Sequence, residues 1–206
     1  MEVLGPVSEW LGVLAFAASG AMVGIRHRLD LFGVLMLGMV TALGGGVIRD
    51  VILGQTPPWA FRHPQFAAAA LCVSAVIFLP RIREGIGHST LFDSLLQAAD
   101  AVGLAAFTVS GIRTAVDAGF DGNTALLLFV GVITGVGGGI LRDQLAGQRP
   151  MVFVKQIYAV ASLAGALVCV GLMRLTDMRM AMLAGFVVVV TLRFSAMHYH
   201  WNLPRA

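Results

Sequence analysis

Apolar runs, separated by short polar or proline-containing stretches, divide the chain into seven segments. The first run covers about residues 7–25 and would be roughly 28 Å long as an α-helix, enough to cross the hydrocarbon core of a bilayer. The other runs cover about residues 31–53, 65–79, 95–112, 124–145, 152–173 and 180–197. The pattern predicts an all-α integral membrane protein with seven transmembrane helices.

Composition supports this class. The 206 residues are 58% hydrophobic and only 12% charged, about half the charged fraction of a typical soluble domain, and the mean hydropathy is +0.86. No stretch is polar enough for a soluble domain, so residues 1–206 are expected to form one membrane domain. The net charge of +3 comes from arginines that flank apolar runs, which indicates membrane anchoring and no nucleic-acid partner. Glu2, with no Lys or Arg before the first run, argues against a cleaved signal peptide.

One stretch of the second run returns in the fifth. Thr41 to Asp50 reads TALGGGVIRD, and Thr134 to Asp143 reads TGVGGGILRD; each is followed by a Gly-Gln pair. Earlier in each half, Glu9 and Ser19 align with Asp100 and Ser110. We therefore expect two repeats of three helices, about residues 7–83 and 95–174, and a seventh helix at about 180–197. Three crossings reverse the chain, so the second repeat is expected to be inverted relative to the first.

The glycine triplets destabilise a helix, because each glycine in a helix interior lowers helix stability by about 1 kcal/mol relative to alanine. Paired glycine-interrupted segments in two halves of a membrane protein point to a substrate or ion path. We expect the second and fifth helices to be broken at the triplets, so that freed carbonyls accept a partly dehydrated cation. The alternative is that the glycines only permit close helix packing. The residues expected along the path are Ser19, Thr41, Gly44, Gly45, Gly46, Ser110, Thr134, Gly137, Gly138 and Gly139.

Charged residues lie near both triplets. They are Glu9, Arg49, Asp50, Asp100, Arg142 and Asp143. Ionisable residues inside a membrane indicate function by default, and a buried arginine needs a partner in any case. The Arg-Asp residues either reach an interface or pair with Glu9, Asp100 or each other, and they act either as structural clamps or as pore residues. Because adjacent helical positions point about 100° apart, we expect pairing between the repeats rather than within one Arg-Asp motif.

Lys and Arg outside these motifs predict the orientation, because they are enriched on the cytoplasmic side. Eight lie on the side of the first, third and fifth loops and the C-terminus: Arg26, Arg28, Arg81, Arg83, Arg149, Lys155, Arg193 and Arg205. Four lie on the other side: Arg62, Arg113, Arg174 and Arg179. The N-terminus is therefore expected outside and the C-terminus inside.

No other chemistry stands out in the sequence. The histidines lie at the ends of apolar runs or in the tail and lack metal-ligand spacing, as do Cys72 and Cys169. Neither a hydrolytic set nor a phosphate-binding loop is recognisable. We expect no enzyme activity, no cofactor and no metal site.

The doubled Gly-Gly-Gly-x-x-Arg-Asp segment, in a chain of seven spans, resembles the prokaryotic branch of the trimeric intracellular cation (TRIC) channel family. In bacteria the same paired domain is also labelled a glycine transporter family or an uncharacterised membrane family. The resemblance implies a homotrimer in the bacterial or archaeal inner membrane, with a potassium-conducting pore inside each protomer. Its partners would be monovalent cations, membrane lipid and the other two protomers.

The sequence hypothesis is accordingly a passive monovalent-cation channel lined by the second and fifth helices. The alternative is a secondary transporter for a small zwitterion such as glycine, which would bind its carboxylate at the positive end of a broken half-helix.

Overall fold

The computed structural model describes residues 4–80, 90–154, 157–199 and 201, and this part of the chain is helical with short connecting turns. The helices are α1 (Leu4–Arg26), α2 (Leu31–Ile52), α3 (Trp59–Arg62), α4 (Pro64–Phe78), α6 (Thr90–Asp117), α7 (Thr124–Leu145), α8 (Met151–Val154), α9 (Ala159–Leu172) and α10 (Met178–His198). Glu2, Arg81, Arg83, Lys155 and Arg205, which entered the sequence predictions, lie outside the described residues, as does the end of the first expected repeat.

Five helices, α1, α2, α6, α7 and α10, are long and apolar enough to cross a membrane. The helices α4 and α9 are also apolar but shorter, with 15 and 14 residues. The predicted all-helical membrane architecture is confirmed. The sixth predicted segment, residues 152–173, is wrong as a single helix, because the described chain forms the short α8 first and begins α9 only at Ala159.

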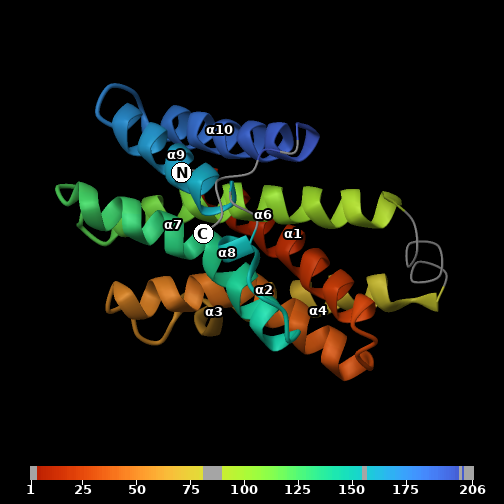
Figure 1. Cartoon of the computed structure of the whole chain (residues 1–206). Helices are drawn as coiled ribbons and strands as arrows, with labels where there is room; N and C mark the ends of the chain where they lie inside the picture. Colours follow the sequence, from red (N-terminus) through yellow and green to blue (C-terminus); the bar gives the residue numbers. More distant parts are fainter. Residues whose placement is uncertain (1–3, 81–89, 155–156, 200, 202–206) are drawn as a thin grey trace.

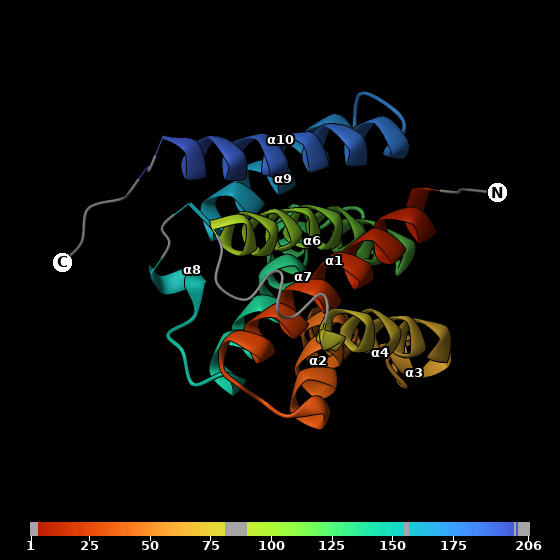
Figure 2. The same cartoon turned by 90° about the vertical axis from the view of Figure 1, so that its right-hand side faces the viewer.

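The helices are arranged in three layers (Figures 1 and 2). The middle layer holds α1, α6 and α7; α2, α3 and α4 lie on one side of it and α9 and α10 on the other. The helices α2 and α7 run in opposite directions where they pack together (Figure 1). This arrangement brings the two repeated sequence segments into contact at the centre of the bundle.

Polar side chains fix where several helices begin. The carboxylate of Asp30 accepts a hydrogen bond from the Gly33 N–H at 2.7 Å before α2, and Asp177 accepts one from Met180 at 3.0 Å before α10. Asn123 does the same for the Leu126 N–H at 3.1 Å before α7. Such caps satisfy N–H groups that the first helical turn leaves unpaired.

The repeated Gly-Gln pairs end α2 and α7. Gly54 and Gly147 adopt left-handed φ values of 69° and 70°. The N–H of Gln55 then reaches the Asp50 carbonyl at 2.8 Å, and that of Gln148 reaches the Asp143 carbonyl, also at 2.8 Å. This is the glycine-dependent helix ending known as the Schellman motif, so these two repeated glycines have a structural explanation.

The expectation that α2 and α7 are broken at the glycine triplets is wrong, because both are continuous α-helices through them. The triplets lie where the two helices cross. A methyl group on Gly45 would overlap with the Thr134 carbonyl oxygen, and one on Gly138 would overlap with that of Thr41. A continuous helix keeps its backbone hydrogen bonds inside the bilayer, and the close backbone contact offsets the cost of the glycines.

Two phenylalanines make similar close contacts with glycines of α1 and α6. The ring of Phe107 on α6 lies against Gly12 on α1, and the ring of Phe16 on α1 lies against Gly103 on α6. The two ring centroids are 5.3 Å apart and tilted by 55°. The antiparallel helices α1 and α6 thus exchange equivalent contacts, which holds the centre of the bundle together.

Candidate functional site

The first of two buried charge clusters surrounds Arg49 near the end of α2. The Nε of Arg49 donates to Oδ1 of Asp50 at 2.8 Å, and its Nη1 donates to Oε1 of Glu9 on α1 at 3.4 Å. Ser110 on α6 donates to the same Glu9 oxygen at 3.2 Å. Arg49 and Asp50 are buried, whereas the Glu9 side chain is 14% exposed.

The second cluster surrounds Arg142 near the end of α7. The Nε of Arg142 donates to Oδ1 of Asp143 at 2.8 Å, and its Nη1 donates to Oδ1 of Asp100 on α6 at 2.6 Å. The same Nη1 also donates to the hydroxyl of Ser19 on α1. The hydroxyl of Tyr158 donates to Asp100 at 3.3 Å. Every side chain of this cluster is buried.

The two arginines make equivalent bonds to carboxylates. Each arginine pairs with the aspartate of its own motif and with the acidic residue of its own repeat. The expected pairing between repeats is therefore wrong for the carboxylates, because the arginine side chain bends back far enough for its Nε to reach the next residue. Only the serines cross over, Ser19 to the second cluster and Ser110 to the first.

The two aspartates also hold the chain that follows each helix. Oδ2 of Asp50 accepts the backbone N–H of Trp59 at 2.6 Å, and Oδ2 of Asp143 accepts that of Met151 at 2.8 Å. Trp59 begins α3 and Met151 begins α8, so both short helices are tied to a buried carboxylate. A hydrogen bond to a charged acceptor contributes about 1.5–3 kcal/mol.

The second cluster has a further cation, Arg193 of α10. Its Nη2 lies 3.7 Å from Oδ2 of Asp100, and its guanidinium lies over the Tyr158 ring, 4.8 Å from the centroid. Arg193 entered the orientation count as a cytoplasmic surface residue, but its side chain is buried inside the bundle, 3% exposed. Neither Arg193 nor Tyr158 was among the residues predicted for the site. A lone arginine inside an apolar run was the signal that could have identified Arg193.

The threonines and glycines of the repeat are all close to the crossing of α2 and α7. Thr41 and Thr134 are fully buried, and each hydroxyl donates at 2.6 Å to a carbonyl of its own helix, that of Leu37 or of Val130. Each threonine also lies against a glycine of the neighbouring helix, Gly20 or Gly111. The glycines at 44, 45, 137, 138 and 139 are buried, and Gly46 is partly exposed.

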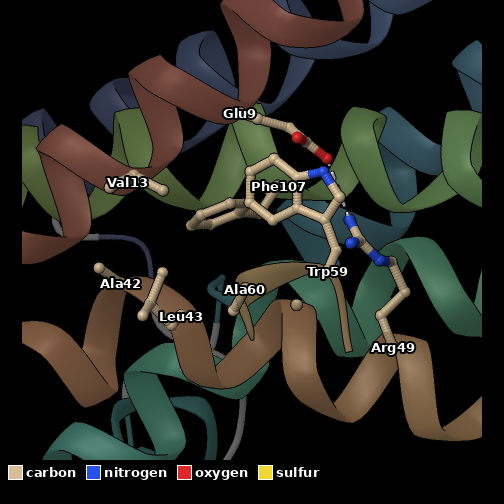
Figure 3. Close-up of a pocket in the computed structure, with 9 residues that line it drawn as sticks. Glu9, Val13, Ala42, Leu43, Arg49, Trp59, Ala60 and Phe107 are labelled. Atoms are coloured by element: carbon tan, nitrogen blue, oxygen red, sulfur yellow. Dashed lines mark hydrogen bonds and ion pairs between the residues drawn. The ribbon is translucent and has the colours of Figure 1, made fainter. Parts of the chain in front are cut away.

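Gly46 and the first cluster border a small pocket (Figure 3). Its lining residues are Glu9, Val13, Ala42, Leu43, Gly46, Arg49, Trp59, Ala60 and Phe107. The side chains of Glu9, Arg49 and Trp59 point toward one another at one side of it (Figure 3). The pocket holds about 10 Å³, roughly the space of one water molecule.

Since Arg49 and Arg142 each follow a crossing glycine by four residues in helices of opposite direction, the two clusters lie on opposite sides of the crossing. Each cluster is about 6 Å along its helix from the glycine contact. The arrangement defines a helical membrane protein with matched charge clusters around a close glycine crossing. Within the described residues, no group of three or more His, Cys, Asp or Glu side chains is placed to hold a metal ion.

This fold is that of the TRIC channels. The TRIC orthologue from Rhodobacter sphaeroides superposes with a TM-score of 0.89 and 32% identity, covering 97% of this chain and 100% of the other. A structure that describes conductance through TRIC cation channels superposes with a TM-score of 0.85 and 35% identity, covering 98% and 96%. The inner membrane protein YadS of Escherichia coli K12 is 36% identical over 200 residues, which are 95% of this chain and 94% of YadS.

The family model described as "Glycine transporter" matches residues 7–81 and again residues 97–174. The chain belongs to this family, which is the prokaryotic branch of the TRIC family.

Proposed function

We propose that the protein is a passive channel for monovalent cations, potassium in particular, with a conduction path inside each protomer. The observation that carries the proposal is the similarity to solved TRIC cation channels over nearly the whole chain, at 28–35% identity and TM-scores of 0.85–0.90. The buried charge clusters support it, because ionisable groups inside a membrane bundle are costly and mark ion paths more often than lipid contacts.

The path runs between α1, α2, α6 and α7 and passes the crossing of the glycine triplets. At the crossing the backbones of Gly45 and Gly138 lie against the facing helix, and the side chains of Leu141 and Ile48 pack against Gly44 and Gly137. In this proposal the path opens when the two helices separate by a few ångströms. Separation exposes the threonine hydroxyls at 41 and 134 and helical carbonyls to water, and oxygen atoms of this kind replace the hydration shell of a potassium ion. Contact between the triplets is then the closed state.

The assembly proposed is a homotrimer of protomers that each hold two inverted repeats, about residues 7–83 and 95–174, with the seventh helix at about 180–197. Seven crossings require α4 and α9 to span the membrane with 15 and 14 residues, shorter than the usual length of about 20. The orientation proposed has the N-terminus outside. The charge count without Arg193 still favours this side, with seven Lys and Arg against four.

The family description favours one second candidate, a transporter for glycine or a similar zwitterion. The Nη2 of Arg142 is buried and lacks a hydrogen-bond partner among the described residues. A guanidinium N–H is a strong donor for a carboxylate. Transport would need the closed crossing to open alternately toward each side.

Flux measurements separate the two functions. Purified protein is reconstituted in potassium-loaded vesicles and in planar bilayers, with empty vesicles as the control. A channel gives unitary current steps and flux that does not saturate at millimolar potassium. Saturable glycine uptake that shows counterflow, without unitary currents, would refute the channel and support the transporter.

A further inference from the structure

The two charge clusters share the same arginine–carboxylate pairs but differ in charge. With every group ionised, the first cluster holds one guanidinium, Arg49, and two carboxylates, Glu9 and Asp50, which gives a net charge of −1. The second holds two carboxylates, Asp100 and Asp143, and two guanidinium groups, because Arg193 joins Arg142 there. Its net charge is zero.

Arg193 comes from outside the repeated units. It lies on α10, which follows both segments that the family model matches. In the first cluster, by contrast, Glu9 is 14% exposed and borders the small pocket beside Trp59 (Figure 3). The difference between the clusters is therefore a property of the last helix and not of the repeats.

Arg193 and Asp100 attract each other through their charges and do not form a hydrogen bond. At 3.7 Å the two groups are an ion pair without a hydrogen bond. Oδ2 of Asp100 and Nε of Arg193 are both buried and lack hydrogen-bond partners within the described part of the chain. The Tyr158 ring holds the guanidinium in place through its face. Arg193 thus adds a positive charge to the cluster, while the hydrogen bonds to Asp100 come from Arg142 and Tyr158.

We propose that Arg193 is the counter-ion that cancels the negative charge of the second cluster, and that it thereby makes cation conduction asymmetric. This inference rests on the proposed channel function. A cation on the path is attracted to the first cluster, beside Glu9, and not to the second. One unit charge about 10 Å from the path, at an effective dielectric constant of about 20, changes cation occupancy by roughly ten-fold.

Single-channel recording in symmetric potassium chloride tests the proposal. Arg193→Gln removes the charge but keeps a polar side chain, whereas Arg193→Lys keeps the charge. We expect the ratio of currents at opposite voltages to change several-fold in Arg193→Gln and to stay close to wild type in Arg193→Lys. The control is Arg26→Gln, which removes an exposed positive charge paired with Asp93. An unchanged current ratio in Arg193→Gln overturns the proposal.

A second measurement does not depend on conduction. Arg193→Gln removes one of the two positive charges beside the Asp100 carboxylate, so the thermal midpoint of this variant in detergent should fall. Adding Asp100→Asn to the same chain should restore at least half of that loss. If Arg193 only filled space, the loss of thermal midpoint in the double variant would equal the sum of the losses in the two single variants. That result would overturn the counter-ion assignment. A wild-type protein that passes no current refutes the channel, and the double variant then still decides the role of Arg193.

Discussion

Gly45 and Gly138 face each other at the crossing of α2 and α7, so closely that neither position has room for a side chain. A Cβ on Gly45 would lie 3.3 Å from the backbone nitrogen of Gly138 and would overlap with a carbonyl oxygen of α7. The obstacle on both sides is backbone, which cannot turn aside as a flexible side chain can. The two halves of the chain are in contact here through their main chains.

Alanine at either position should destabilise the protein. Gly45→Ala and Gly138→Ala force the two helices apart, and overpacking of this kind costs about 1–3 kcal/mol. The measurement is the thermal midpoint of the purified protein in detergent. Gly171→Ala is the matched control, because Gly171 is also helical but has nothing within 4 Å of an added Cβ. If all three variants unfold at the same temperature, the close crossing does not exist.

The leucine variants test the path itself. Gly45→Leu and Gly138→Leu put a large side chain into the crossing, and we expect both to abolish potassium flux in vesicles. Flux is compared with that of wild type at equal protein content, with size-exclusion chromatography to establish that each variant remains folded. Unchanged flux in both folded variants would remove the triplets from the path.

Loss of the second arginine should cost more than loss of the first. Arg142→Met leaves Asp100 and Asp143 deeply buried with reduced compensation, and removing one partner of a buried ion pair costs about 3–5 kcal/mol. Arg49→Met should cost less, because Glu9 is 14% exposed and can be hydrated from the pocket. Denaturant unfolding measures the order. Equal losses, or a larger loss for Arg49→Met, would contradict the difference in burial.

Valine substitutions at Thr41 and Thr134 test whether these residues line the conduction path or only stabilise the helices. Thr41→Val and Thr134→Val keep the shape but remove the hydroxyl that now bonds its own helix. The loss of one such bond costs about 1 kcal/mol, so the variants should fold. If the hydroxyls line the path, single-channel conductance falls several-fold. Conductance equal to wild type in both folded variants would leave these residues a packing role alone.

The surface pair of Arg26 and Asp93 should contribute little. Both side chains are about half exposed, at 46% and 53%, and exposed ion pairs contribute about 0–1 kcal/mol. Asp93→Asn should therefore leave the thermal midpoint within the error of the measurement at physiological salt. A loss as large as that of Arg142→Met would show that charge at this end of α6 holds the bundle together.

Hydropathy and local signals predicted most of the helices. The predicted boundaries 31–53 and 124–145 agree with α2 and α7 to within one residue, because polar residues and turn signals bound both apolar runs. The doubled motif also identified most of the charged residues that the structure brings together. Helix boundaries and repeated motifs depend on residues that are close in sequence, so they can be predicted from the sequence alone.

Contacts between distant segments were not predictable in the same way. The triplets suggested a broken helix, since the cost of glycine is visible in the sequence while the partner helix that offsets it is not. The ring contact between Arg193 and Tyr158, and the ion pair of Arg193 with Asp100, join three segments that show no common pattern. The two arginine motifs pair within themselves because a flexible side chain is not confined to the direction of its Cα–Cβ bond.

Arg193 makes the last helix indispensable to a site built by the repeats. A protein made of the two duplicated halves alone would leave Asp100 with one arginine fewer, in a place that water does not reach. The electrostatic balance of this interior site therefore depends on a residue outside both segments that the family model matches.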